Sequence, residues 1–325
     1  MFKILKEMLL DSLTRSAKVV WMLVKIMFPV ALAFRLLKMA GAMPYIGDAL
    51  SPLMQWVGLP GEMGLVWAVT LLVNVYGGIF TYLTLLPTLA EPLSVAQVTV
   101  LTTVMLIAHT FPAELTVARK CGVRLWFAFS MRFFMALLAG VLLNLIYHST
   151  GWLAEPSHPI VHLDMPDATW GLWLLSQLRN FALIFVVVFS MVLLIKILDK
   201  IKVLQWVNKA LYPLVKHLGI GINAVPSVLV GLTMGLAYGG GIILAEAEER
   251  QLSQADLLYS LVFLGLCHSI IEDTLLMMSC GAHYSGVLIF RVLFALIVCR
   301  IFILITRRTG IRWLVVPPAK TSLPR

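Results

Sequence analysis

The chain has few charged residues for its length. Only 13% of its 325 residues are Asp, Glu, Lys or Arg, whereas 60% are hydrophobic, and the mean hydropathy is +0.94. Soluble globular chains carry about 25% charged residues. No stretch of mixed charge is long enough for a soluble catalytic domain. The composition therefore indicates an integral membrane protein whose main partner is the lipid bilayer.

The sequence also lacks the motifs of several enzyme classes. There is no G-x-x-x-x-G-K-[ST] phosphate loop, no glycine-rich dinucleotide fingerprint and no H-E-x-x-H zinc protease motif. Its four cysteines contain no C-x-x-C pair, so neither a disulfide framework nor a zinc ribbon is indicated. We therefore expect no enzymatic activity and no resident cofactor.

Acidic residues are outnumbered by basic ones, which gives a formal net charge of +9. In membrane proteins Lys and Arg collect on the cytoplasmic side, and this explanation is simpler than nucleic-acid binding. The N-terminal segment is amphipathic and has no small-residue cleavage site, so we expect no removed signal peptide.

The chain contains the same pattern twice. A Tyr-Gly-Gly motif, a histidine, an acidic residue and an arginine follow one another in both halves, with 159 to 162 residues between partners. The pairs are Leu50 with Leu211, Tyr76 with Tyr238, His109 with His268, Glu114 with Asp273, and Arg132 with Arg291. A duplicated membrane unit with glycine-interrupted apolar segments at matching positions is typical of secondary transporters.

Each half has four hydrophobic blocks. They cover residues 19–40, 63–90, 95–118 and 124–148 in the first half, and 171–198, 225–247, 257–280 and 284–306 in the second. Basic residues flank the blocks near 3–18, 119–124, 200–216 and 307–312, whereas 149–170 has no Lys or Arg. These charges agree with one orientation only if each half crosses the membrane three times.

One block in each half must then enter and leave the membrane on the same side. The block with Tyr-Gly-Gly is the candidate, because glycine permits a tight reversal between two short half-helices. We predict an all-α polytopic membrane protein of two inverted repeats, each with three spanning helices and a re-entrant helical hairpin. The first repeat covers residues 1–150, an extracytoplasmic linker 151–170 and the second repeat 171–325. We expect the protein to lie in the cytoplasmic (inner) membrane of a bacterial cell, with both termini in the cytoplasm.

Polar residues inside the apolar blocks are candidates for the functional site, because such residues are costly in a membrane. We expect Pro112 to break the helix and bring Glu114 towards His109. The second half has no such proline, and there Glu272 is four residues after His268, on the same helical face. The predicted substrate-binding residues are Tyr76, Gly77, Gly78, His109, Glu114, Tyr238, Gly239, Gly240, His268, Glu272 and Asp273.

One arginine inside the last block of each half needs a partner within the membrane. We predict that Arg132 pairs with Glu114 and that Arg291 pairs with Asp273. These could be structural ion pairs, an anchor for an anionic substrate or part of a proton relay. Residues 267–283 also contain Cys, His, Glu, Asp and Met side chains that suit soft or borderline metals. Their spacing matches no recognised closed site, so metal binding stays open.

The repeated unit resembles the Gate domain, also called the nucleoside recognition domain. This domain is shared by concentrative nucleoside transporters, the membrane part of bacterial ferrous-iron transporters and spore maturation proteins. The resemblance covers residues of about 50–148 and 211–306. It implies hairpin tips at Tyr76–Gly78 and Tyr238–Gly241 that meet broken helices at His109–Glu114 and His268–Asp273 near the middle of the membrane.

The chain departs from these relatives in two respects. The polar Gln/Thr/Glu signature of a nucleoside-binding hairpin is absent from 63–90 and 225–247, and no GTPase domain is attached. We expect a secondary transporter for a small polar solute or ion. The sequence does not decide between a nucleoside-like and a metal cargo, and it is compatible with a homo-oligomer. The alternatives are a non-transporting membrane scaffold or assembly factor, and an intramembrane enzyme that uses His268 with Glu272 or Asp273 as general base.

Overall fold

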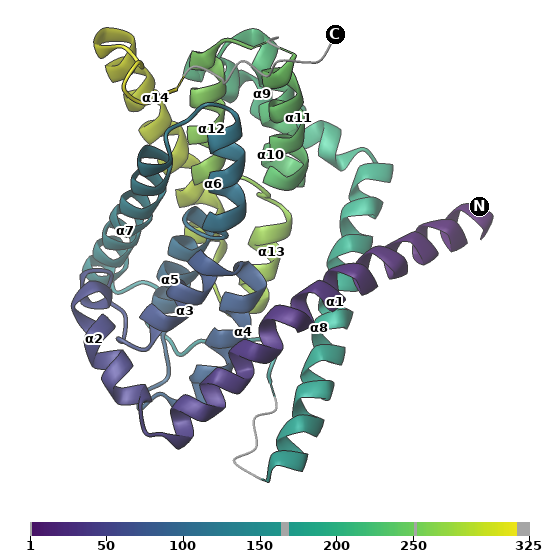
Figure 1. The fold of residues 1–325 in the computed structure, drawn as a ribbon, viewed down its shortest axis with the longest axis vertical. Helices are drawn as coiled ribbons and strands as arrows, with labels where there is room; N and C mark the ends of the chain where they lie inside the picture. Colours follow the sequence, from purple (N-terminus) through teal and green to yellow (C-terminus); the bar gives the residue numbers. More distant parts are fainter. Residues whose placement is uncertain (1, 164–168, 250–251, 317–325) are drawn as a thin grey trace.

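The computed structural model describes residues 2–163, 169–249 and 252–316, and these are almost entirely helical (Figure 1). The first half contains α1 (Phe2–Met39), α2 (Met43–Trp56), α3 (Met63–Leu72), α4 (Val75–Leu85), η1 (Leu86–Thr88), α5 (Val95–Ile107), α6 (Phe111–Lys120) and α7 (Leu125–Thr150). The second contains α8 (Trp170–Lys200), α9 (Val203–Leu218), η2 (Ile222–Ala224), α10 (Val225–Met234), α11 (Leu236–Glu248), α12 (Gln254–Leu266), α13 (Glu272–Ser279), the π-helical η3 (Ser285–Phe290) and α14 (Arg291–Thr309).

Five helical segments of the described chain are long and apolar enough to cross a membrane. They are Met8–Met39, Val95–Lys120, Leu125–Thr150, Trp170–Lys200 and Ser285–Thr309. These segments confirm the predicted all-α polytopic membrane fold. The sixth predicted block, 257–280, is divided into α12 and α13, in the same way as Val95–Lys120 is divided into α5 and α6, and each of these four helices is too short to span alone. Broken helices at both places were implied by the resemblance.

Two surface helices were not among the predicted blocks. They are α2 and α9, which contain Pro52 and Pro213, and these prolines are 161 residues apart. Both helices are amphipathic, with buried residues on one side and exposed residues on the other. Both helices contain polar residues and are therefore less hydrophobic than the spanning blocks. A search for apolar residues that recur every 3.6 positions would have found them.

A pair of short helices occupies each predicted hairpin block. The chain reverses after α3, and the side chain of Asn74 accepts a hydrogen bond of 2.8 Å from the backbone N–H of Gly77 at the start of α4. In the second half the reversal occurs at Gly235, whose φ of +89° is a backbone conformation that favours glycine. Both reversals precede the Tyr-Gly-Gly motifs, so the predicted tips at Tyr76–Gly78 and Tyr238–Gly241 were placed too late in the chain.

Close helix contacts correct the alignment of the two motifs. Gly78 of α4 packs against Thr70 of α3, and Gly239 of α11 packs against Gly231 of α10. Thr70 and Gly231 are 161 residues apart in the sequence, and so are the first residues of α4 and α11. Gly78 therefore corresponds to Gly239, and the tyrosines of the two motifs are not equivalent. Sequence identity had suggested an offset of 162.

Both third blocks are interrupted helices. The chain leaves α5 after Ile107 and α12 after Leu266, and it turns at Thr110 (φ +51°) and Ser269 (φ +46°). These residues are 159 positions apart, and left-handed backbone is uncommon for residues other than glycine. The interruption therefore does not need Pro112, which lies in the first turn of α6, where proline is tolerated.

Equivalent long helices of the two halves run antiparallel. Asp11 of α1 forms an ion pair with Lys196 of α8, and at their other ends Arg35 lies 4.4 Å from the ring centre of Trp170. The start of α7 is bound to the segment after α14 through Arg124 N–H and Leu314 C=O at 2.9 Å. An inverted arrangement would require such pairs, but the inverted repeat itself stays a prediction.

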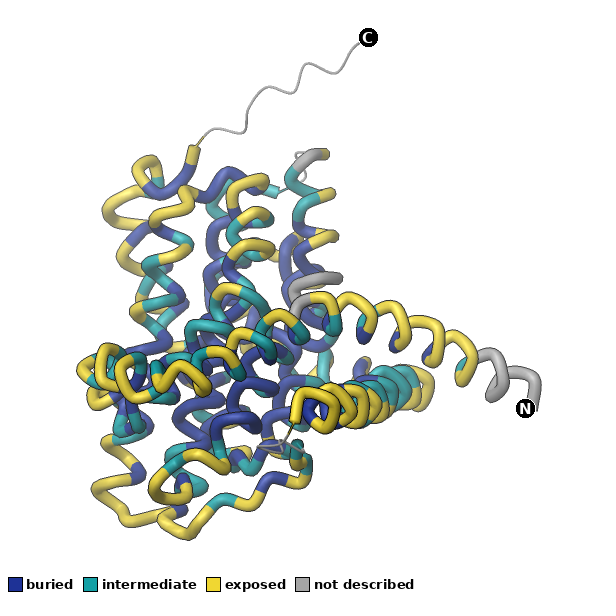
Figure 2. Tube along the Cα trace, turned by 60° about the horizontal axis from the view of Figure 1, so that its bottom comes forward, coloured by how far each residue is buried: buried dark blue, intermediate teal, exposed yellow. Residues whose placement is uncertain are grey.

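The buried residues gather in a central bundle that holds the hairpins and the interrupted helices (Figure 2). Helices α1 and α8 lie side by side at its flank, with a small core that they share with Phe80 of α4, and with exposed outer faces. The two histidines at the interruptions are both buried in the bundle. The fold thus brings polar residues of both halves into its most enclosed part.

The contact between α10 and α11 leads to a stability prediction. A Cβ atom at Gly239 would overlap the backbone of Gly231, whereas one at Gly241 in the same helix meets nothing within 4 Å. We expect Gly239→Ala to lower the free energy of unfolding by about 1–3 kcal/mol through overpacking. Gly241→Ala should leave it unchanged or raise it by up to about 1 kcal/mol, because alanine favours helix. Thermal unfolding in detergent measures both, and equal effects of the two variants would contradict this packing.

Candidate functional site

The two repeated histidines meet at the centre of the bundle. His109 follows the end of α5 and His268 follows the end of α12, and their Nε2 atoms are 3.1 Å apart. Each residue is only 5% exposed. The sequence placed both in the middle of an apolar block, and the structure brings them into direct contact although 159 residues separate them.

Hydrogen bonds to the backbone fix which ring nitrogens face each other. Nδ1 of His109 lies 3.1 Å from the carbonyl oxygen of Met105, and Nδ1 of His268 lies 2.7 Å from that of Leu264. A carbonyl can only accept, so each Nδ1 must donate, and each Nε2 of a neutral ring then carries a lone pair. Two lone pairs face each other across 3.1 Å. A positive charge shared between them would turn this repulsion into attraction.

Glu114 in the first turn of α6 completes the cluster. Its Oε1 atom lies 3.2 Å from Nε2 of His109 and 3.8 Å from Nε2 of His268. Its Oε2 atom forms an ion pair with Nη1 of Arg132. The side chain of Glu114 is 12% exposed, so this carboxylate is largely removed from solvent. We call His109, His268 and Glu114 the central cluster.

Arg132 of α7 fastens the cluster to both interrupted helices. Its Nε–H donates to the carbonyl oxygens of Ile107 at 3.1 Å and Gly265 at 3.0 Å, near the ends of α5 and α12. Its guanidinium lies 5.2 Å from the ring centre of Phe111. The structure thus brings together the predicted pair of Arg132 and Glu114, and it adds backbone partners from both halves.

The second half is not an equal copy of this arrangement. Arg291 pairs with Asp273 through Nη1 and Oδ2 at 3.4 Å, a looser contact. The hydroxyl of Tyr76 in the first half donates to Oε1 of Glu272 at 3.1 Å. We predicted that Glu272 would share a helix face with His268, and this was wrong because the chain is not helical between them.

One glycine of each motif serves close helix packing, Gly78 against Thr70 and Gly239 against Gly231. Gly77, Gly78, Gly239 and Gly240 lie near the starts of α4 and α11, and all four are buried. The side chain of Tyr238 lies outside the described residues. Whether these positions contact a substrate stays a prediction.

Potential metal ligands converge at one place in the described part of the chain. Only one group there has three or more His, Cys, Asp or Glu ligand atoms within 4.8 Å of one another, and it is the central cluster. The ligand-rich stretch at 267–283 does not converge. Nδ1 of His283, for example, faces the hydroxyl of Ser285 at 2.8 Å. The matching positions of the two histidines in the repeat led us to predict both as substrate-binding residues, but not that they contact each other.

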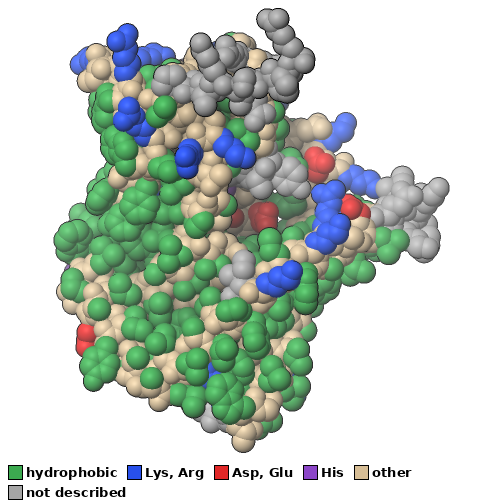
Figure 3. Space-filling model, viewed as in Figure 1, with side chains coloured by type: hydrophobic (Ala, Val, Ile, Leu, Met, Phe, Trp, Pro, Cys, Tyr) green, Lys and Arg blue, Asp and Glu red, His purple; other side chains and the backbone are tan. Residues whose placement is uncertain are grey.

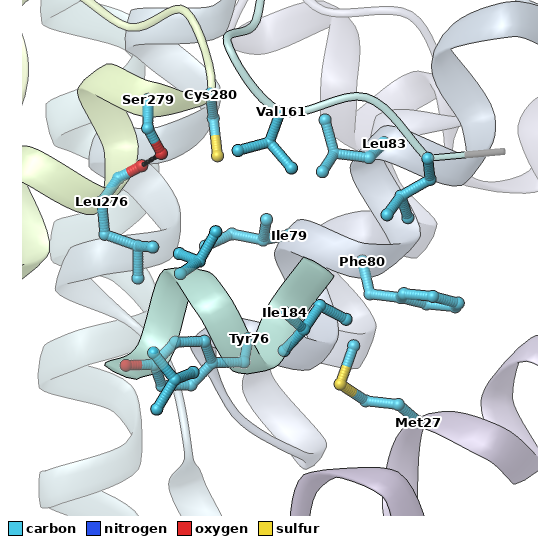
Figure 4. A pocket seen from close by; sticks show the side chains of 13 residues that line it. Met27, Tyr76, Ile79, Phe80, Leu83, Val161, Ile184, Leu276, Ser279 and Cys280 are labelled. Carbon is cyan, nitrogen blue, oxygen red and sulfur yellow. Dashed lines mark hydrogen bonds between the residues drawn. The ribbon is translucent and has the colours of Figure 1, made fainter. Parts of the chain in front are cut away.

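Two small pockets adjoin this region. One, of about 30 Å³, lies beside Glu114 and Arg132 and is otherwise lined mainly by apolar residues of α6, α7 and α12. The other, also of about 30 Å³, is apolar and lies between α4, α8 and α13 (Figure 4). A water molecule needs about 10–15 Å³ on this measure, so each pocket has room for about two waters. Figure 3 shows acidic side chains at the bottom of a recess on the face where Figure 1 places α13.

These features define a polytopic all-α membrane protein with a buried polar site between two interrupted helices. Residues 181–283 match the family model Gate, described as nucleoside recognition. Residues 181–283 are thus similar to a Gate domain, which confirms the resemblance that the sequence indicated for this part of the second half; the match does not extend to residues 50–148.

A curated relative matches almost the whole chain. The "uncharacterized membrane protein YvoD" of Bacillus subtilis (strain 168) is 29% identical over 292 residues, which cover 89% of this chain and 91% of the relative. No solved structure matches. The relative supports a membrane protein over the full length described above.

The ion pair of Arg132 and Glu114 predicts strong coupling between the two residues. Arg132→Met and Glu114→Gln should each lower the free energy of unfolding, Arg132→Met by more, because it also removes the donor to two carbonyls. Breaking a buried pair costs about 3–5 kcal/mol. The loss of unfolding free energy in the double variant should be smaller than the sum of the two single losses by about 0.5–3 kcal/mol. Thermal unfolding of the four proteins measures this coupling, and simple additivity would show that the pair contributes nothing.

Proposed function

We propose that the protein is a secondary transporter that moves a small polar solute or ion through the place where the interrupted helices meet. The observation that carries this proposal is the central cluster, which draws its residues from both halves and is buried in the bundle. Substrate sites of secondary transporters lie at the interface between repeats and are built from discontinuous helices. A packing role alone would be served better by apolar side chains.

The ends of the half-helices supply suitable electrostatics. Glu114 lies in the first turn of α6, and Glu272 and Asp273 lie in the first turn of α13. The positive ends of the two helix dipoles therefore stabilise carboxylates next to the site. The histidines follow the C-terminal ends of α5 and α12, where the partial charge is negative. This end favours a positive charge on or between the rings.

The distribution of basic residues supports an orientation for the proposed transporter. Arg300 and Arg307 of α14 donate to the carbonyl oxygens of Leu218 and Gly219 at the end of α9. The segment between α6 and α7 is bound to residues just after α14 at the same end of the bundle, where Lys and Arg gather in Figure 3. Under this proposal the protein lies in a bacterial inner membrane with that end facing the cytoplasm, and residues 151–163 face outwards.

The size of the pockets favours a small cargo. Neither pocket described above exceeds about 30 Å³, which is far below the roughly 300–1,000 Å³ of sites for drug-sized ligands. An ion or a small solute fits such a site in this conformation, whereas a nucleoside would require the bundle to open. The scaffold alternative needs no opening at all, and this difference can be measured.

Cysteine accessibility tests the proposed pathway. Ala118→Cys places a thiol in the pocket beside Glu114 and Arg132. We expect a membrane-impermeant thiol reagent to label it from one face of oriented vesicles, because alternating access opens the site to one side at a time. The wild type, whose four cysteines are all buried, gives the background.

Leu138→Cys, on an exposed face of α7, is the matched control and should stay unlabelled if that face contacts lipid. If the thiol at position 118 is unreactive from both faces under all conditions, the pathway is absent and a non-transporting scaffold is the better explanation.

A further inference from the structure

We infer that the central cluster binds a divalent transition-metal cation of the zinc or ferrous class through Nε2 of His109, Nε2 of His268 and Oε1 of Glu114. We also infer that this cation is the cargo, and this second statement rests on the proposed function. The inference starts from the geometry of the three ligand atoms.

The distances between the ligand atoms match a coordination sphere. Zinc binds imidazole nitrogen and carboxylate oxygen at about 2.0–2.2 Å, and tetrahedral geometry then separates the ligand atoms by about 3.3–3.6 Å. The three separations in the cluster are 3.1 Å between His109 and His268, 3.2 Å between His109 and Glu114, and 3.8 Å between His268 and Glu114. They bracket the expected value, so a cation fits after shifts of a few tenths of an ångström.

The surrounding hydrogen bonds prepare each residue to act as a ligand. Histidines that bind metals donate their other ring N–H to a carbonyl or carboxylate, which fixes the tautomer and the orientation of the ring. Both histidines do this here, to Met105 and Leu264. Arg132 holds the second oxygen of Glu114 and leaves Oε1 directed at the rings. An ordinary hydrogen-bonded histidine pair would need one Nε2 to donate, and the Nδ1 contacts disfavour this in neutral rings.

The charges near the cluster accommodate a cation. Arg132 is a nearby positive charge and by itself would oppose metal binding. Three carboxylates, those of Glu114, Glu272 and Asp273, outnumber the two guanidinium groups in this region. Asp273 is close enough to interact electrostatically with His109 and Glu114. With neutral histidines and all three carboxylates ionised, the region carries one more negative than positive charge before a cation binds.

The ligand types and their number restrict the metal. Imidazole suits zinc, copper, iron and nickel, whereas magnesium and calcium prefer oxygen ligands alone. Structural zinc sites are closed by four protein ligands, and sites that exchange a ligand keep one position open. The central cluster supplies three ligands, which suits an ion that must enter and leave.

Direct metal binding by the purified full-length protein tests the site. After removal of bound metal with a chelator, Zn²⁺ titrated by calorimetry should bind with one ion per chain, and Co²⁺ should give the visible absorption of a low-coordinate site. Mg²⁺ and Ca²⁺ at a large excess should not displace either ion. A wild type that is folded and binds no Zn²⁺ or Co²⁺ would overturn the inference, and the cluster would then share only a proton.

Substitutions locate the ion within the chain. His109→Gln, His268→Gln and Glu114→Gln should each weaken Zn²⁺ binding by more than about 100-fold, because loss of outer partners alone typically costs 10–100-fold. The matched controls are His217→Gln, an exposed histidine of α9, and His283→Gln, which lies outside the cluster. Both controls should bind like the wild type. Thermal unfolding without metal identifies variants that fail to fold, and folded cluster variants with unchanged affinity would overturn the site.

Uptake into proteoliposomes separates the site from the proposed transport. Vesicles loaded with a zinc-sensitive dye should accumulate Zn²⁺ with the wild type and with His217→Gln, and not with His268→Gln. Stoichiometric binding without uptake would support the site and contradict the transporter. Uptake of another solute by a protein that binds no metal would contradict the site and leave the transporter standing.

Discussion

The structure depends on satisfying the backbone where two helices break inside an apolar bundle. Unpaired N–H and C=O groups are not tolerated there unless the protein or a wet cavity supplies partners. Each interruption is bonded to the hairpin of its own half, from Thr110 N–H to Thr70 C=O at 2.9 Å and from Ile270 N–H to Leu232 C=O at 2.8 Å. The hairpins therefore supply hydrogen-bond partners to the backbone at both interruptions, where the histidines of the central cluster lie.

This arrangement explains why one half does not suffice. The first half supplies His109, Glu114 and Arg132, and the second supplies His268 and the carbonyl of Gly265. The second half uses its own acidic residues differently, since one pairs with an arginine and the other with a tyrosine of the first half. The two halves thus have a similar order of helices, but their polar side chains differ and form one central cluster between them.

Much of the fold could be predicted from hydrophobicity and repetition. The long apolar blocks predicted the positions of the spanning helices, and the repeated histidines marked the places where both third blocks are interrupted. The hairpin turns were misplaced because Tyr-Gly-Gly looked like a reversal, whereas Asn74 and Gly235 make it and the glycines permit close packing. The pairing of His109 with His268 could not be derived, because the sequence of one chain does not say which segments meet across the bundle.

The bonds of Arg132 bear on how the two halves can move relative to each other. One Nε–H is shared between Ile107 of α5 and Gly265 of α12, while Nη1 holds Glu114. Any sliding of α12 along α5 must detach one of these carbonyls and leave it buried without a donor, at a cost of about 1–3 kcal/mol. A single side chain therefore ties α5, α6 and α12 together, and any relative movement of these helices has to break at least one of its bonds.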